Sequence, residues 1–161
     1  MAMVAHALTP HQRRSWDAVG YAVVPGATSS ARLLDLAAEV LGGPAELVAT
    51  TVDVRAPGQR GTGWHHVGDG GRGVTAWVAF TPADLVAGCV WVVPGSHRDP
   101  PPAGVGGAAA STVAPDPATT RPLPLRAGDL LLLHDRLVRR VTDNHSVTPS
   151  AVRVSRFLPA G

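Results

Sequence analysis

Two pairs of adjacent residues in this sequence carry the side chains best suited to proton transfer or metal binding. His65 and His66 form the first pair and are followed closely by Asp69, while His134 comes directly before Asp135. Imidazole and carboxylate groups transfer protons near neutral pH, and they are also ligands that Fe(II) accepts in proteins. The sequence therefore predicts either an acid–base site or a metal site built around these histidines.

The spacing around the first pair limits how a metal could be held there. Side chains of an extended strand alternate between two faces, so His65, Val67 and Asp69 share one face and His66 lies on the other. The rise of a strand separates the Cα atoms of His65 and Asp69 by about 13 Å, too far to share one ion unless the neighbouring glycines bend the chain. A metal site would also need a third ligand, for which His134 and His145 are the candidates.

Composition excludes several kinds of catalysis. All 14 basic residues are arginine, so the sequence has neither a Schiff-base lysine nor a phosphate-loop lysine. The single cysteine, Cys89, rules out an internal disulfide and a multi-cysteine metal site, and its apolar neighbours indicate a buried, inert thiol. The arginines are scattered without interleaved aromatic residues, so we do not expect nucleic acid as a partner.

The length and hydropathy of the chain are typical of one cytoplasmic domain covering residues 1–161. Hydrophobic residues make up 45% of the sequence, which is enough to enclose a core. The N-terminus lacks the pattern of a signal peptide, and no apolar run approaches the roughly 20 residues of a membrane helix. We expect a small-molecule substrate and no membrane partner, with a homodimer and a monomer both open. The lysine-free composition is associated with GC-rich bacterial genomes.

The N-terminal part, residues 9–43, is predicted to hold two helices and a short strand. Thr9 is suited to cap a helix that Gly20 ends, and the strand 21–24 follows before Pro25 and Gly26. Ser29 or Ser30 begins the second helix, whose leucines and alanines follow helical spacing up to Gly42.

The rest of the chain is predicted to be mainly β, as a sandwich or barrel of short strands. Strands are expected at 47–54, 64–67, 74–80, 89–93, 129–134 and 151–157. Residues 99–124 are rich in Pro, Gly, Ala and Thr and predict a long surface loop, either a plain insertion or a lid.

Three segments resemble the phytanoyl-CoA dioxygenase-like (PhyH) family of Fe(II)/2-oxoglutarate oxygenases. They are Gly20-Tyr-Ala-Val-Val-Pro-Gly26, Trp77 to Asp84 leading into Gly88 to His97 with its Pro-Gly-Ser-His ending, and Ala127-Gly-Asp129 followed by Asp143-Asn-His-Ser146. The resemblance implies a double-stranded β-helix, or jelly roll, with N-terminal helices. It also implies Fe(II) held by a His-x-Asp/Glu pair and a distant histidine, with an arginine gripping the cosubstrate carboxylate.

Most of the ligand positions implied by the resemblance are altered here. His65 matches the first histidine, but Val67 stands at the carboxylate position and Arg139 at the distal histidine. Neither an aliphatic side chain nor a guanidinium donates a lone pair to a cation. The cosubstrate arginine would fall on Ser150, with Arg153 three residues later. We therefore expect no resident cofactor, with Fe(II) and 2-oxoglutarate in a rebuilt site as the alternative.

The candidate catalytic residues are His65, Asp69, His134 and Arg139. His65 is placed in the barrel cavity by the resemblance, while Asp69 is either a turn carboxylate or an acid–base group. His134 alternates with Asp135, so one of the two leaves the surface for the interior, and the sequence leaves open which. Arg139 is either a solvated loop residue or a fixed positive charge in the cavity.

The candidate substrate-binding residues are Trp64, His66, Trp77 and Arg153. The tryptophans are more typical of barrel wall than of a ligand platform, and His66 would point away from His65 in a regular strand.

Three functional hypotheses follow from the kept histidine and the lost ligands. The leading one is a metal-independent, non-oxidative enzyme that isomerises, cyclises, dehydrates or eliminates from a small natural-product intermediate, with His65 as acid or base. The second is an Fe(II)/2-oxoglutarate dioxygenase with an unusual metal site. The third is a small-molecule-binding protein without catalysis.

Overall fold

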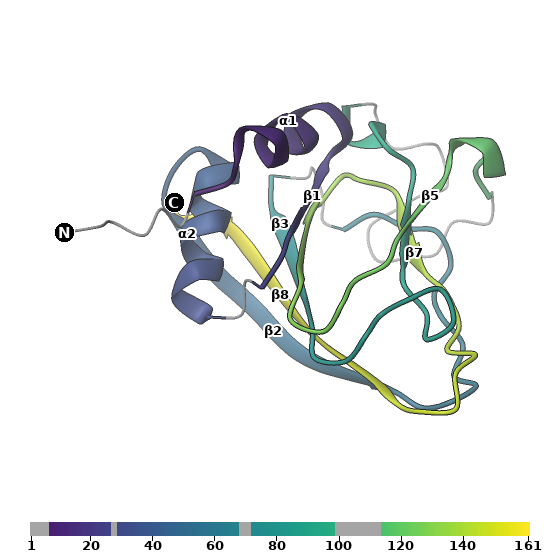
Figure 1. Cartoon of the computed structure of the whole chain (residues 1–161). Coiled ribbons are helices and arrows are strands. Elements are labelled where there is room, and N and C mark those ends of the chain that lie inside the picture. Colours follow the sequence, from purple (N-terminus) through teal and green to yellow (C-terminus); the bar gives the residue numbers. More distant parts are fainter. Residues whose placement is uncertain (1–6, 27–28, 68–71, 99–113) are drawn as a thin grey trace.

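Two antiparallel β-sheets and two helices make up the architecture (Figure 1). The structure is a computed structural model, and it describes residues 7–26, 29–67, 72–98 and 114–161. Strands dominate these residues, and both helices belong to the N-terminal part, as the sequence predicted.

Both helices begin and end where the sequence placed their caps. Helix α1 (Pro10–Val19) starts at Thr9, whose hydroxyl accepts a hydrogen bond from the Gln12 N–H while the Gln12 side chain accepts one from the Thr9 N–H. This reciprocal capping satisfies two of the N–H groups that a helix N-terminus leaves free. Helix α2 (Ser30–Leu41) is capped by Ser29 rather than Ser30 and ends at Gly42, whose φ of 75° is left-handed.

The larger sheet has five strands in the order β1-β6-β3-β8-β2, all paired antiparallel. All five strands were predicted from the sequence: β1 has its predicted bounds, and the ends of the other four differ from the prediction by at most two residues. Their bounds are β1 Tyr21–Val24, β2 Ala45–Arg55, β3 Val74–Ala79, β6 Leu130–His134 and β8 Ser150–Pro159.

The smaller sheet has three strands in the order β5-β4-β7, with bounds Arg121–Leu123, Val90–Val92 and Arg139–Val141. The predicted strand 64–67 forms only an isolated bridge between His65 and Arg139, which extends this sheet beside β7. Strands β5 and β7 were not predicted from the sequence, because three-residue strands contain too few residues to show an alternating pattern. Their pairing partners, distant in sequence, define them.

The region predicted as a loop over 99–124 is corrected where the structure describes it. Residues from 114 onward form a short 3-10 helix, η2 (Pro117–Thr119), and then β5. A second 3-10 helix, η1 (Ser96–Arg98), ends the Pro-Gly-Ser-His segment. Residues 99–113, on which the lid alternative mainly rests, lie outside the described residues.

The leucine run of β6 is buried on both faces of the larger sheet. Leu130 and Leu132 pack with the helices around Trp16, whereas Leu131 and Leu133 pack between the two sheets. All four side chains are fully buried, which explains why this strand reads as continuous rather than alternating hydrophobic sequence. One strand thus separates a helix-covered layer from the space between the sheets.

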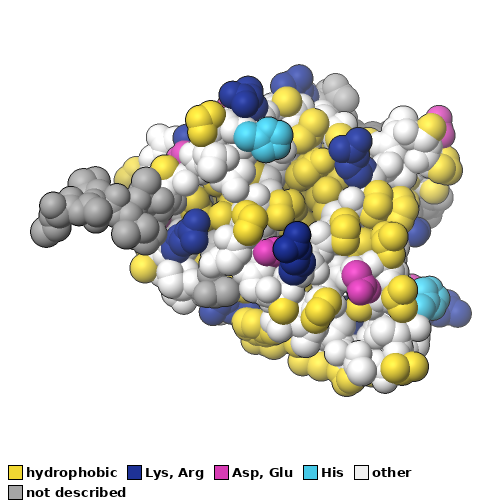
Figure 2. Space-filling model, in the orientation of Figure 1, with side chains coloured by type: hydrophobic (Ala, Val, Ile, Leu, Met, Phe, Trp, Pro, Cys, Tyr) yellow, Lys and Arg dark blue, Asp and Glu magenta, His cyan; other side chains and the backbone are white. Residues whose placement is uncertain are grey.

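Strand β2 lies at the edge of the larger sheet and exposes much of its apolar surface. Its side chains Leu47, Val48, Val52 and Val54 are 44–60% exposed. Figure 2 shows hydrophobic side chains along the lower edge of the molecule, where Figure 1 places β2 and β8. The strand is held chiefly by its long ladder with β8, and this register decides which β2 side chains face the interior.

Candidate active site

His65 and Arg139 face each other across the edge of the smaller sheet. The N–H of each residue donates to the carbonyl of the other, with both distances 2.8 Å. Residues paired in this way in an antiparallel ladder project their side chains from the same face. A guanidinium therefore stands beside His65.

His65 opens into a hollow of about 380 Å³ bounded by both sheets. Trp77 of β3 contributes to this wall, and it pairs with Val154 of β8, which in turn pairs with Thr51 of β2. Because paired residues share a face, these three side chains form one inward-facing row. The lining residues are Thr51, Val52, Asp53, Arg55, Gln59, Arg60, Gly61, Thr62, His65, Trp77, Val141 and Val154.

The ring of His65 is held in one tautomer by the backbone carbonyl of Gly63. Its Nδ1 lies 2.9 Å from the Gly63 carbonyl, which can only accept a hydrogen bond, so Nδ1 carries the proton. Burial lowers the pKa of His65, and the nearby positive charge of Arg139 lowers it further. The neutral imidazole is therefore favoured, with Nε2 as a proton acceptor.

Arg139 is buried beneath this site, with only 2% of its surface exposed. Its Nη2 donates to the carbonyls of His134 and Asp135 at 3.4 and 3.2 Å, whereas Nε and Nη1 are buried without a hydrogen-bond partner among the described residues. Burial lowers the pKa of Arg139 to about 10, which still leaves it charged at neutral pH.

Asp135 balances part of this buried positive charge. Its fully buried carboxylate accepts two hydrogen bonds from Arg156, from Nε at 3.1 Å and Nη2 at 2.8 Å, and one from Thr75 at 3.3 Å. Arg156 binds this carboxylate directly, whereas Arg139 donates to the backbone carbonyl of Asp135 and interacts with the carboxylate only through space. One carboxylate therefore lies near two guanidiniums beside His65.

These residues do not fit the Fe(II) site that the resemblance implies. Of the three corresponding positions, only His65 offers a lone pair, while Val67 is aliphatic and Arg139 brings a positive charge to the place of a cation. In the described part of the chain, no group of three or more His, Cys, Asp or Glu side chains could hold a metal ion. Asp69 lies outside the described residues.

His134 lies on the other side of the larger sheet from His65. Its ring packs 5.6 Å from that of Trp16 in α1 and 5.2 Å from that of His97, and its Nδ1 accepts from the Arg136 N–H. Burial lowers the pKa of His134 to about 4. The choice left open between this residue and Asp135 is settled: Asp135 enters the space between the sheets, and His134 faces the helices.

The other residues singled out in the sequence are split between the two faces. Trp77 lines the hollow with His65. His66 and Trp64 are buried on the opposite face of their segment, with Arg140 5.4 Å above the Trp64 ring. Arg153 lines a separate hollow beside α2 on the outer face of β8.

Arg55 of β2 lines the hollow, although the sequence patterns did not single it out. Arg55 pairs with Ser150, the position at which the resemblance expects an anion-gripping arginine. Strand alternation places it with Thr51 and Asp53 on the inner face, and this parity was a signal available in the sequence. What the sequence did not reveal was the pairing partner, 95 positions away.

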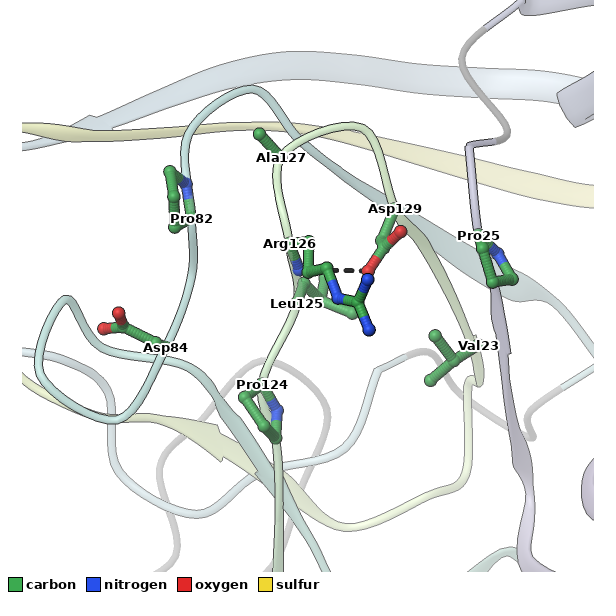
Figure 3. Close-up of a pocket in the computed structure, with 9 residues that line it drawn as sticks. All are labelled: Val23, Pro25, Pro82, Asp84, Pro124, Leu125, Arg126, Ala127 and Asp129. Carbon is green, nitrogen blue, oxygen red and sulfur yellow. Dashed lines mark hydrogen bonds between the residues drawn. The ribbon is translucent and has the colours of Figure 1, made fainter.

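A larger hollow of about 620 Å³ lies elsewhere and is a poorer candidate (Figure 3). Prolines form much of its rim, and its two carboxylates are engaged in turns. Asp129 accepts from the Arg126 N–H at 3.0 Å, and Asp84 accepts from two backbone N–H groups that follow it. Its acidic groups therefore stabilise local backbone.

Comparison with known proteins identifies relatives by sequence. Residues 47–149 match the family described as phytanoyl-CoA dioxygenase (PhyH). The mouse phytanoyl-CoA dioxygenase domain-containing protein 1 is 37% identical over 89 residues, and its rat counterpart is 35% identical. The match covers 47% of this chain and 30% of the length of each of these relatives.

Solved structures share the fold over nearly the whole chain. The epimerase SnoN from nogalamycin biosynthesis, described as alpha ketoglutarate dependent, superimposes with a TM-score of 0.79 at 21% identity, covering 93% of this chain and 82% of its own. The carbocyclase SnoK gives 0.80 at 19% identity, covering 95% and 85%. EvdO2 from Micromonospora carbonacea var. aurantiaca gives 0.82 at 18% identity, covering 99% and 94%. These likenesses confirm the jelly-roll fold.

Neither helix in the described residues is long and apolar enough to cross a membrane.

Proposed function

Because the chain belongs to the phytanoyl-CoA dioxygenase (PhyH) family, we propose that it uses the family's barrel for metal-independent, non-oxidative acid–base catalysis. The reaction would be an isomerisation, cyclisation, dehydration or elimination of a small natural-product intermediate. The observation that carries this proposal is the Arg139 guanidinium beside His65, where the family resemblance implies a metal ligand.

His65 is the proton acceptor in this reaction. Its protonated Nδ1 is oriented by the Gly63 carbonyl, so Nε2 removes a proton from a carbon next to a substrate carbonyl. The electron pair of the C–H bond moves onto the carbonyl oxygen and forms an enolate. In a β,γ-unsaturated substrate the negative charge extends over a dienolate, and His65 returns the proton to the γ carbon, which completes an isomerisation. With a leaving group on the β carbon, the enolate instead re-forms the carbonyl, makes a Cα–Cβ double bond and expels that group with its electron pair, which completes an elimination. A positioned base of this kind supplies about 10²–10⁴-fold in rate.

Arg139 acts through charge rather than through contact. It is almost fully buried and is absent from the lining of the hollow, so it stabilises the enolate at a distance and keeps His65 neutral before the reaction. A fixed charge in a site with little water is effective because it needs no reorganisation as the negative charge develops. Arg139 is therefore a positioning and electrostatic residue.

The solved relatives support the breadth of the scaffold and not the absence of a cofactor. SnoN and SnoK are named as an epimerase and a carbocyclase, and both are described as alpha ketoglutarate dependent. Family membership accordingly favours an Fe(II)/2-oxoglutarate dioxygenase as a second candidate. Succinate release from 2-oxoglutarate in the presence of iron would identify it.

Deuterium exchange in the presence of EDTA tests the leading proposal. Acetoacetate, oxaloacetate and 2-oxoglutarate are incubated with the protein in D₂O, and loss of the proton next to the carbonyl is followed by NMR. We expect faster exchange of at least one compound by the wild type and a loss of about 100-fold or more in His65→Gln. His145→Gln is the matched control, because His145 is exposed and lies outside the hollow. Exchange that His65→Gln leaves unchanged would refute His65 as the base.

A further inference from the structure

Arg55 places a buried positive charge in the wall of the hollow. It is the last residue of β2, pairs with Ser150 on the inner face of the sheet, and has only 4% of its surface exposed. It lines the same hollow as His65, from the opposite sheet. The proposed reaction does not use it.

The guanidinium of Arg55 is only weakly hydrogen bonded by the protein. Its Nη1 is buried without a hydrogen-bond partner among the described residues, and its Nη2 makes a single long bond of 3.4 Å to the Gln59 carbonyl. The two ion pairs found in the described part of the chain involve other arginines. A buried guanidinium that forms no direct ion pair is costly, and this cost favours the binding of an anion beside it.

Neither carboxylate near Arg55, that of Asp143 or that of Asp53, forms an ion pair with it in the described residues. Asp143 accepts from the Gly61 N–H at 2.7 Å, and this hydrogen bond is the main cause that lowers the pKa of Asp143, with Arg55 only a minor one. Asp53 shares the inner face two residues earlier on β2 but forms no ion pair with Arg55 in the described residues. The charge of Arg55 is thus left for a ligand.

The surrounding backbone fixes Arg55 in place before a ligand arrives. The fully buried Asn144 donates from its side chain to the Arg55 carbonyl at 3.1 Å. Gly88 packs so closely that a Cβ atom there would lie 2.9 Å from Nη1. A guanidinium held in this way loses little freedom on binding, which favours affinity.

We propose that Arg55 anchors the carboxylate group of the substrate, so that the ligand of this hollow is a small carboxylic acid. The planar guanidinium matches a carboxylate through two parallel hydrogen bonds. The anchored ligand lies between Arg55 of β2 and His65 at the edge of the smaller sheet. The inference deepens the proposed function, because it names the class of substrate on which His65 would act.

Binding measurements test this without requiring turnover. Isothermal titration calorimetry with EDTA present uses four probes: acetoacetate, succinate, 2-oxoglutarate and inorganic phosphate. We expect the wild type to bind at least one carboxylate more tightly than phosphate, and Arg55→Gln to weaken that binding by about tenfold or more. Arg121→Gln is the matched control, because Arg121 is a strand arginine that lines a different hollow, and its affinity should match the wild type.

A swap across the strand pair separates anchoring from folding. Because Arg55 and Ser150 are register partners, the double variant Arg55→Ser/Ser150→Arg moves the guanidinium to the adjacent strand and should recover affinity to within about fivefold of the wild type. Thermal unfolding confirms that each variant is folded. No carboxylate binding by the wild type, preferential binding of phosphate, or unchanged affinity in folded Arg55→Gln would each overturn the proposal.

The same titrations distinguish this proposal from the proposed reaction. His65→Gln should retain carboxylate binding within about threefold while losing deuterium exchange, because the anchor and the base stand on different strands. Carboxylate binding that depends on Arg55 without any exchange would leave the anchor in place and refute the chemistry.

Discussion

Replacing Arg139 with methionine should stabilise the protein while impairing its proposed chemistry. Arg139 buries two nitrogen atoms that have no hydrogen-bond partner among the described residues, and its carboxylate neighbour Asp135 already bonds Arg156 and Thr75. Methionine is also long and flexible, but it has no donors to satisfy. The substitution therefore removes a desolvated charge that the fold does not need.

The size of the effect follows from the contacts of the guanidinium. Two buried, unpartnered donors cost about 1–3 kcal/mol each, or about 4 kcal/mol together at the midpoint. The two hydrogen bonds lost with Arg139 are long and contribute about 1 kcal/mol each. Neither carbonyl is left unpaired, because that of His134 still accepts from Leu137 and that of Asp135 from Val67. The net gain is about 2 kcal/mol, or a rise in Tm of about 4–8 °C for a chain of this length.

Urea unfolding and calorimetry measure the free energy of unfolding and Tm of Arg139→Met. Arg140→Met is the control: it lies next in sequence, its guanidinium stacks over Trp64 on the outer face, and its loss should cost about 0.5–1 kcal/mol. NMR titration should show a higher pKa for His65 in Arg139→Met, because the positive charge that lowers it is gone. A loss of more than about 1 kcal/mol in Arg139→Met would show that the guanidinium holds the fold together and would refute this reasoning.

Three further predictions concern the same region. Asp135→Asn should lower the free energy of unfolding by about 2–4 kcal/mol in urea unfolding, less than for a fully buried pair because the Arg156 side chain is 31% exposed; an unchanged value would contradict the role of this ion pair. The pKa of His134 is lowered to about 4, so between about pH 6.5 and pH 4 the folded state binds fewer protons than the unfolded state. The free energy of unfolding should therefore be highest above about pH 6.5 and fall by about 1–2 kcal/mol as the pH drops to 4. His134→Gln should flatten that dependence, and an equally steep curve in the variant would assign it to another group. Gly61→Ala should cost more than about 2 kcal/mol because its Cβ would collide with a backbone carbonyl of β7, whereas Gly43→Ala, which has open space, should stay within about 0.5 kcal/mol on thermal unfolding.

Local sequence patterns were sufficient for the elements whose signals lie within a few residues. Thr9 and Gly20 bound the first helix as predicted, because capping depends on hydrogen bonds between neighbours. The leucine run of β6 and the last strand were likewise found from their composition. Strands β5 and β7 escaped, since a three-residue strand is defined by its partner rather than by its own sequence.

The sequence alone determined the chemical inventory of this protein: no lysine, one cysteine, and a histidine at position 65 with valine and arginine where metal ligands were expected. Tertiary structure decided how that inventory is distributed. It placed Asp135 between the sheets and His134 against the helices, and it brought Arg55 into register with Ser150. The physical reason is that side-chain identity is a local property, whereas the face on which a strand residue lies depends on pairings between segments far apart in the chain.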